Sequence, residues 1–182
     1  MSATVCFLHG RESGPWGTKI RRLSRVAEQF GCRVVSPDDR DTQDPEERVR
    51  RLVTLGATLP RPVILVGSSM GGYVAAAASA ALHPAGLFLL APAVGLPGYE
   101  LAAPQAQAPL ITVVHGWDDA IVPTAKVIEF ARTHRATLHL LADGHLLHND
   151  LERVARLFGE FLGVCLGRNR PGAPRRELVA AL

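Results

Sequence analysis

The feature that most constrains the fold is a regular alternation between two apolar patterns along the chain. Some of the short β-type runs are continuously apolar, such as Val63-Ile64-Leu65-Val66, which is typical of strands buried on both faces of a parallel sheet. The six runs span residues 4–8, 33–36, 62–66, 86–90, 110–114 and 136–141. This pattern favours a sheet whose successive strands are joined by long connections rather than by tight hairpins.

Segments with helical spacing lie between these runs. Within 18–30 the apolar residues recur three or four apart, and arginines occupy the other face. Asp44 and Pro45, followed by two glutamates, mark the start of another helix, since a capping Asp, an early proline and acids near the N-terminus all favour one. Further helices are predicted at 70–82, 123–133 and 149–162.

Strand and helix in alternation predict an α/β fold with a doubly wound, mostly parallel sheet of about six strands and helices on both faces. The 182 residues suffice for one domain, which we place at 1–165, followed by a basic C-terminal tail at 166–182 that is either flexible or docked on a partner. Ligands of such folds bind beyond the carboxyl ends of the strands. The segments directly after the strands are therefore the candidates for chemistry.

Charge and cysteine content exclude several other classes. The formal net charge is only +3, part of the excess lies in the tail, and no recognition motif accompanies it, so we expect no nucleic-acid partner. Three cysteines without a CxxC spacing argue against a disulfide framework or a cysteine zinc site. No run approaches the roughly 18 apolar residues of a membrane span, and no leader pattern opens the chain. We expect a cytoplasmic protein.

The third β-type run ends in Gly67-Ser68-Ser69-Met70-Gly71-Gly72, a G-x-S-x-G pattern between a strand and an Ala-rich helix. A nucleophile on a sharp strand-to-helix turn needs small neighbours, and the start of the helix offers free N–H groups to an oxyanion. The pattern predicts Ser69 as a nucleophile. The alternative is a Gly/Ser-rich loop, for instance a phosphate cradle, although no Gly-Lys-Ser/Thr follows as in a Walker loop.

The first β-type run ends in His9-Gly10-Arg11, at the start of a loop rich in glycine. An oxyanion hole uses the N–H after the nucleophile and a second N–H from the loop after an earlier strand. The backbone amides of Met70 and Arg11 are our candidates, and the alternative is an ordinary Gly-rich turn. We interpret His9 as a structural histidine that hydrogen-bonds the loop rather than as a base.

Two later strand ends supply an acid and a base. Asp118 and Asp119 follow the fifth run, and we favour Asp119 because it leads directly into the next helix, where it could alternatively serve as a helix cap. His145 and His148 follow the last run, and we favour His145 because it lies earlier and directly after a glycine. The order Ser, Asp, His is that expected when a carboxylate orients an imidazole beside a serine on this architecture.

A metal site could be imagined at Asp143, His145 and His148, but no HExxH or comparable ligand set supports it. We therefore predict no metal and no cofactor.

Four motifs together resemble those of α/β-hydrolase fold serine esterases. They are L-H-G-R-E-S-G-P-W-G-T-K, G-S-S-M-G-G, H-G-W-D-D-A-I-V-P and D-G-H-L-L, and the resemblance covers residues 4 to about 163. The first is similar to small bacterial YqiA-type esterases, and the last two resemble acyl-protein thioesterase-like hydrolases. The resemblance implies Ser69 as nucleophile, Asp119 as orienting acid, His145 as base, and the amides of Met70 and Arg11 as oxyanion hole.

The chain departs from this family in two ways. The His-Gly loop begins at His9 without preceding strands, which predicts a trimmed six-stranded sheet, and Arg11 stands where an apolar residue is common. The connection 91–109 is too short for a helical lid, so we expect a shallow, open site. Trp16, Leu96 and Tyr99 are candidates for its apolar wall.

These observations predict a serine hydrolase that cleaves carboxylic ester or thioester bonds of small or exposed acyl substrates through an acyl-enzyme. The alternative is a hydrolase-fold binding protein with little catalytic activity that acts through a protein partner. The expected partner is a small-molecule ester or thioester, and the protein is expected to be a monomer or a homodimer.

Overall fold

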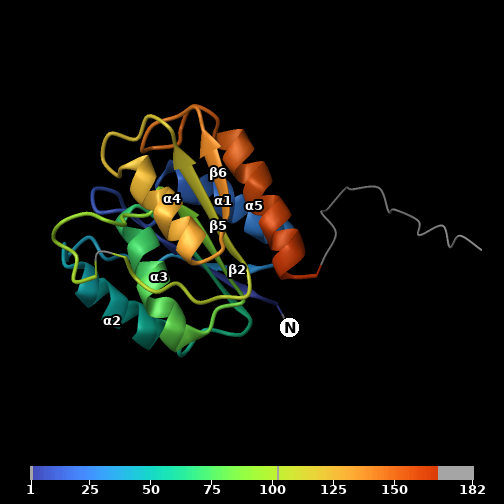
Figure 1. Ribbon diagram of the computed structural model, residues 1–182. Helices are drawn as coiled ribbons and strands as arrows, with labels where there is room; N and C mark the ends of the chain where they lie inside the picture. Colours follow the sequence, from blue (N-terminus) through green and yellow to red (C-terminus); the bar gives the residue numbers. More distant parts are fainter. Residues whose placement is uncertain (1, 102, 168–182) are drawn as a thin grey trace, which may run out of the picture.

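A single six-stranded parallel sheet forms the centre of the computed structural model, which describes residues 2–101 and 103–167 (Figure 1). Its strands are β1 (Thr4–Leu8), β2 (Arg33–Val35), β3 (Val63–Ser68), β4 (Gly86–Leu90), β5 (Ile111–Gly116) and β6 (Thr137–Leu141). The strand order is β2-β1-β3-β4-β5-β6, and every neighbouring pair is parallel. The predicted α/β class and sheet are confirmed.

Helices connect the strands and cover both faces of the sheet (Figure 1). They are α1 (Thr18–Gln29), α2 (Pro45–Gly56), α3 (Met70–Leu82), α4 (Thr124–Thr133) and α5 (Leu151–Cys165). The predicted start of α2 holds in detail, because the Asp44 side chain accepts a hydrogen bond from the N–H of Glu46.

Alternate residues of the strands enter two separate hydrophobic cores. Phe7 and Phe88 face the core shared with α1 and α5, whereas Leu65 and Leu87 face the core shared with α2, α3 and α4. All four side chains are fully buried. Burial on both faces explains why the central strands are continuously apolar in sequence.

Some elements extend beyond their predicted bounds at the edge that carries the loops of interest. β3 continues to Ser68, which pairs with Leu90, and β5 continues to Gly116, which pairs with Leu141. Glycine and serine at these positions concealed the strand ends from an apolar pattern. The start of α5 falls two residues later than predicted, because the Asp150 side chain caps the helix by accepting from the N–H of Arg153.

The strand order reverses direction between β1 and β3. The chain proceeds from β1 outward to β2 and then returns to place β3 on the other side of β1. In an open parallel sheet this reversal leaves a crevice at the carboxyl ends of the two strands. The loops after β1 and β3 therefore meet at the position where a ligand is expected.

The connection between β4 and β5 forms no helix in its described residues, so a large helical lid is absent from this part of the chain. Across the described ranges, no helix has both the length and the apolar character needed to cross a membrane. The division at residue 165 stays a prediction, and residues 168–182 of the predicted tail lie outside the described chain.

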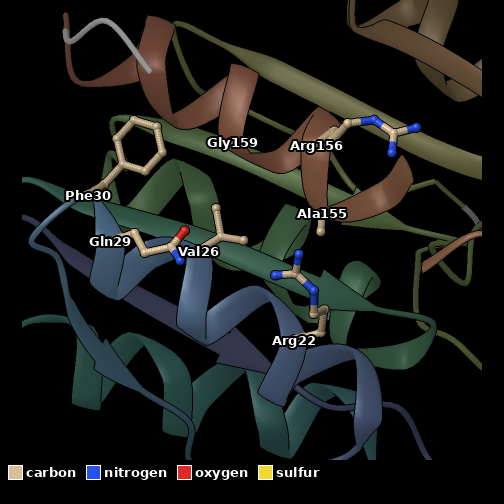
Figure 2. Close-up of a pocket in the computed structure, with 7 residues that line it drawn as sticks. All are labelled: Arg22, Val26, Gln29, Phe30, Ala155, Arg156 and Gly159. Carbon is tan, nitrogen blue, oxygen red and sulfur yellow. The ribbon is translucent and has the colours of Figure 1, made fainter. Parts of the chain in front are cut away.

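α1 and α5 pack side by side on one face of the sheet (Figure 2). The guanidinium of Arg22 binds both carboxylate oxygens of Glu152 at 2.7 Å, which ties the two helices together. A small pocket lies along their seam, lined by Arg22, Val26, Gln29, Phe30, Ala155, Arg156 and Gly159.

Candidate active site

Ser69 lies on the turn that joins β3 to α3, in a backbone conformation that residues with side chains rarely adopt. Its φ is 54° and its ψ is −119°. The turn is held by hydrogen bonds on both sides of the residue, since the Ser69 N–H donates to the carbonyl of Leu90 and its own carbonyl accepts from the N–H of Ala93. The strained conformation is therefore fixed by the neighbouring β4 segment.

The glycines of the G-x-S-x-G pattern are required by close backbone contacts. A Cβ on Gly67 would lie 2.2 Å from the carbonyl oxygen of Gly71, and a Cβ on Gly71 would lie 2.1 Å from the carbonyl oxygen of Leu8. Any side chain at either position would force the strand and the helix apart. The spacing thus reflects the tight packing that places Ser69 above the sheet.

His145 lies between Ser69 and Asp119. Its Nε2 is 3.0 Å from Ser69 Oγ, and its Nδ1 is 2.8 Å from Asp119 Oδ2. A carboxylate can only accept, so Nδ1 carries the proton and Nε2 has a lone pair directed at the serine hydroxyl. The structure therefore brings the three predicted residues into one hydrogen-bonded row.

The side chain of Asp119 is fully buried and is held by hydrogen bonds to both of its carboxylate oxygens. Its Oδ1 accepts from the N–H groups of Ile121 and Val122, both at 2.8 Å, while Oδ2 faces His145. Burial on its own would raise the pKa of this carboxyl, but the hydrogen bonds from Val122, His145 and Ile121 outweigh it and lower the pKa. Asp119 therefore stays ionised beside the imidazole.

Asp118 and His148, the alternatives to Asp119 and His145, occupy different surroundings. Asp118 is exposed, and its backbone N–H donates to the carbonyl of Asp143. His148 is exposed. Neither side chain joins the row formed by Ser69, His145 and Asp119.

Close packing between the ends of β5 and β6 sets the distance from Asp119 to His145. A Cβ on Gly116 would lie 2.2 Å from the carbonyl oxygen of Asp143, so only glycine allows the two strand ends to approach this closely. The buried carboxylate of Asp143 then accepts from the N–H groups of Gly144 and Asn149, which fixes the loop that carries His145. No motif in the sequence pointed to this role for Asp143.

The loop after β1 lies against the nucleophile. A Cβ on Gly10 would be 3.5 Å from Ser69 Cβ. Within the described part of the chain, the N–H groups of Met70 and Arg11 have no hydrogen-bond acceptor, unlike the N–H of Ser69. Both N–H groups belong to segments that meet beside Ser69, and their role as oxyanion donors stays a prediction.

His9 is buried and bonds the loop rather than the nucleophile. Its Nε2 is 3.1 Å from the backbone N of Asp39, and its Nδ1 is 2.7 Å from the carbonyl oxygen of Gly10. A backbone N–H can only donate, so Nε2 accepts and Nδ1–H donates to Gly10.

Two charged or titratable groups near the row were not found from sequence. His115 is buried, with Nε2 3.1 Å from the carbonyl oxygen of Val122 and Nδ1 3.6 Å from Asp119 Oδ2, and burial lowers its pKa. Burial also lowers the pKa of Lys19 to about 8, although the carboxylates of Asp143 and Asp119 oppose this shift.

The predicted apolar wall is only partly exposed. Leu96 and Tyr99 are half-buried and pack on the core beneath α3, where the Tyr99 ring lies 4.6 Å from that of Tyr73. Trp16 is 44% exposed. Five of the six exposed large apolar side chains in the described chain follow carboxyl ends of strands, namely Trp16, Leu101, Trp117, Ile121 and Leu146.

The described residues contain no group of three or more His, Cys, Asp or Glu side chains arranged to hold a metal ion. The protein groups gathered at this edge are a serine hydroxyl, an imidazole, a carboxylate and backbone amides.

Comparisons with known proteins show the family to which the chain belongs. Residues 7–180 match the model of the alpha/beta hydrolase family. A solved protein from Xanthomonas campestris pv. campestris, assigned to the alpha/beta superfamily of hydrolases, is 36% identical, with a TM-score of 0.82 over 88% of this chain and 98% of that one. No curated protein matches the sequence.

Two more distant structures share the fold. Est1E from Butyrivibrio proteoclasticus has a TM-score of 0.78 at 16% identity, over 92% of this chain and 89% of that one. XC6422 from Xanthomonas campestris, described as a serine hydrolase without a lid, has a TM-score of 0.62 at 21% identity, over 93% of this chain and 84% of that one.

Proposed function

Because this chain belongs to the alpha/beta hydrolase family, we propose that it is a serine hydrolase that cleaves carboxylic esters or thioesters through an acyl-enzyme intermediate. The observation that carries the proposal is the row Ser69 Oγ, His145 Nε2 and Nδ1, Asp119 Oδ2, with distances of 3.0 and 2.8 Å. A serine hydroxyl at its ordinary pKa is a weak nucleophile, and an adjacent imidazole oriented by a carboxylate removes this limitation.

In the proposed reaction, His145 Nε2 takes the Ser69 proton while Oγ attacks the substrate carbonyl. The carbonyl oxygen becomes an oxyanion, which the N–H groups of Met70 and Arg11 stabilise. His145 then gives its proton to the leaving alcohol or thiol, and the acyl group remains on Oγ. Water then attacks the acyl carbonyl while His145 takes one of its protons, and His145 passes this proton to Ser69 Oγ as the bond from Oγ to the acyl carbon breaks, which releases the acid and regenerates the serine.

The ionised, buried Asp119 supports the proposed role of His145 as base. When the imidazole becomes an imidazolium, its positive charge lies next to a carboxylate that two backbone N–H groups already hold in place. Little reorganisation is needed at the moment of proton transfer, which is the general advantage of a preorganised site.

The surroundings of Ser69 support substrates with small or exposed acyl groups. The described residues between β4 and β5 form no helical cover, and exposed apolar side chains such as Trp16 and Leu146 border the carboxyl edge of the sheet. We propose that these side chains contact the apolar part of the substrate, with Leu96 and Tyr99 behind them. A small-molecule ester or thioester fits such an open edge.

The proposal is tested by a panel of p-nitrophenyl esters and the corresponding acyl thioesters, with acetyl, butyryl and octanoyl groups. The wild type is expected to turn over the short esters or thioesters, and Ser69→Ala is expected to lose nearly all of this turnover. Ser68→Ala is the matched control, because it alters the neighbouring serine of the same turn without removing the proposed nucleophile. Equal rates for wild type and Ser69→Ala would refute the proposal.

We also propose a cytoplasmic location and a monomeric or homodimeric state. Cys6 and Cys165 form no disulfide within the described part of the chain, as is usual in a reducing compartment. Light scattering of the full chain would determine the oligomeric state.

A further inference from the structure

Arg48 is a buried cation directly behind the loop that follows β1. It belongs to the first turns of α2 and is only 2% exposed, which is unusual for an arginine. Burial lowers its pKa, while the carboxylates of Asp39 and Asp41 oppose the shift. Keeping a guanidinium in such a place requires that its N–H groups find partners.

The hydrogen bonds of the Arg48 side chain go to backbone carbonyls. Nε and Nη2 lie 3.1 and 2.8 Å from the carbonyl oxygen of Thr42. Nη1 lies 3.4 Å from the carbonyl oxygens of both His9 and Gly10. One planar fork thus joins the segment before α2 to the loop beside Ser69.

The Gly10 carbonyl receives three donors: His9 Nδ1–H at 2.7 Å, Arg48 Nη1 at 3.4 Å and the Ser13 hydroxyl at 3.5 Å. This carbonyl and the N–H of Arg11 belong to the same peptide unit. The unit is planar and trans, so its C=O and N–H point in opposite directions. Donors that hold the Gly10 oxygen toward Arg48 therefore direct the Arg11 N–H away from Arg48.

Without such donors the peptide unit would be free to rotate. Gly10 has no Cβ, so its backbone has more accessible conformations than that of any other residue. Gly10 nevertheless packs directly against the nucleophile, since a Cβ on Gly10 would lie 3.5 Å from Ser69 Cβ. The direction of the following N–H is the remaining variable, and the donors to the Gly10 carbonyl determine it.

We propose that Arg48 is a positioning residue of the oxyanion hole, which acts with His9 by holding the Gly10 carbonyl so that the Arg11 N–H faces the reacting oxygen. The inference rests on the proposed serine hydrolase function. Arg48 touches neither the substrate nor the triad. Its effect is transmitted through one peptide unit, and it is greatest where the oxyanion develops.

The prediction separates binding from catalysis. Misdirecting the Arg11 N–H should leave ground-state binding almost intact, because the substrate carbonyl carries no full charge before attack. It should weaken the tetrahedral species. The loss of one oxyanion donor costs about 10²–10³ in kcat, so partial misdirection in Arg48→Met should lower kcat by about 10- to 100-fold.

The experiment compares wild type, Arg48→Met, Arg48→Lys and Arg51→Met on a short p-nitrophenyl ester, with kcat and KM measured separately. Inhibition by a trifluoromethyl ketone is measured in parallel, because its adduct with Ser69 carries the oxyanion. Arg51 is the matched control. It lies on the same helix and binds Asp41, Glu47 and Asp39, so it anchors the same neighbouring loop without touching Gly10.

Arg48→Met is expected to lose kcat and ketone affinity by similar factors, with KM within about twofold of wild type. Arg48→Lys should fall in between, because an ammonium cannot fork across the two carbonyls. Arg51→Met should keep kcat within about twofold. A folded Arg48→Met with wild-type kcat would overturn the inference, as would an equal loss in Arg51→Met.

Should Arg48→Met fail to fold, Arg48→Lys decides by the same criteria, with a wild-type kcat counting against the inference. Failure of the proposed function looks different, because the wild type itself would then show no turnover that depends on Ser69.

Discussion

Replacing Asp119 by asparagine should disable His145 while leaving the loop in place. Oδ1 of Asp119 accepts from the N–H groups of Ile121 and Val122. An asparagine keeps these bonds only if its carbonyl oxygen takes the Oδ1 position. Its NH₂ group then faces His145 Nδ1, which must become an acceptor. The proton moves to Nε2, and His145 can no longer take the proton of Ser69.

The magnitude depends on the cost of the opposite orientation. Turning the asparagine so that its oxygen faces His145 would leave the two backbone N–H groups against an NH₂ group. Each buried, unsatisfied donor costs about 1–3 kcal/mol, so the two together cost about 2–6 kcal/mol. At 1.36 kcal/mol per factor of ten, the competent orientation is depleted by between about 30-fold and 3 × 10⁴-fold, and we expect a loss in kcat of about 10³-fold.

The assay is steady-state hydrolysis of a short p-nitrophenyl ester, with thermal unfolding measured on the same samples. Asp119→Asn should unfold within a few degrees of wild type, because its size and backbone bonds are kept. Asp118→Asn is the matched control and should retain kcat within about twofold, since the Asp118 side chain lies outside the row. A loss below tenfold in a folded Asp119→Asn would refute the tautomer argument.

Three further outcomes are expected from the surroundings of the site. Gly71→Ala should lower the free energy of unfolding by at least about 1–3 kcal/mol in a denaturant titration, because the new Cβ would lie 2.1 Å from the Leu8 carbonyl oxygen. Gly17→Ala is the control and should change this free energy little, because the nearest atom to its new Cβ would be 3.8 Å away. Burial raises the pKa of the Cys6 thiol to about 12, so the folded protein at pH 8 should show no alkylation of Cys6 by iodoacetamide, and rapid alkylation there would contradict this. Burial lowers the Lys19 pKa to about 8 in the folded state, below its ordinary 10.5, so the unfolded chain binds more protons between these pH values. The free energy of unfolding should therefore rise with pH across this window. A Lys19→Met variant in which the free energy of unfolding rises equally steeply with pH would disprove the assignment.

Much of the sheet could be predicted because its residues carry the information locally. Continuous runs such as 63–66 and 86–90 have no exposed face and therefore suit only strands buried on both sides. The predicted helix at 70–82 has the same bounds as α3. Misplaced boundaries, such as the end of β3, occur where pairing with a neighbour extends a strand through Gly67 and Ser68, and this pairing is a property of the folded sheet.

The strand ends also brought the site residues within reach of one another, because parallel strands in one sheet share their carboxyl edge. The choices of Asp119 over Asp118 and of His145 over His148 rested on the immediate neighbours of each candidate in the chain. The structure adds the distances that give these choices a chemical meaning.

Arg48 could not be identified in this way. It stands in Glu46-Glu47-Arg48-Val49-Arg50-Arg51, a segment that indicates a solvated helix face. Only its spacing from Leu52, one turn later on the buried side of α2, indicated that Arg48 faces the core. Its partner Gly10 is 38 residues away, and that contact depends on the return of the chain from β2 to β3.

The measurement that tests the central claim most directly is mass spectrometry of the protein after reaction with a fluorophosphonate. Such reagents form a covalent bond with an activated serine, and the row Ser69, His145, Asp119 predicts one adduct per chain, on the peptide that contains Ser69. Ser69→Ala should remain unlabelled, and Asp119→Asn should label far more slowly than wild type. An unlabelled wild type, or equal labelling of Ser69→Ala, would contradict the assignment of Ser69 as an activated nucleophile.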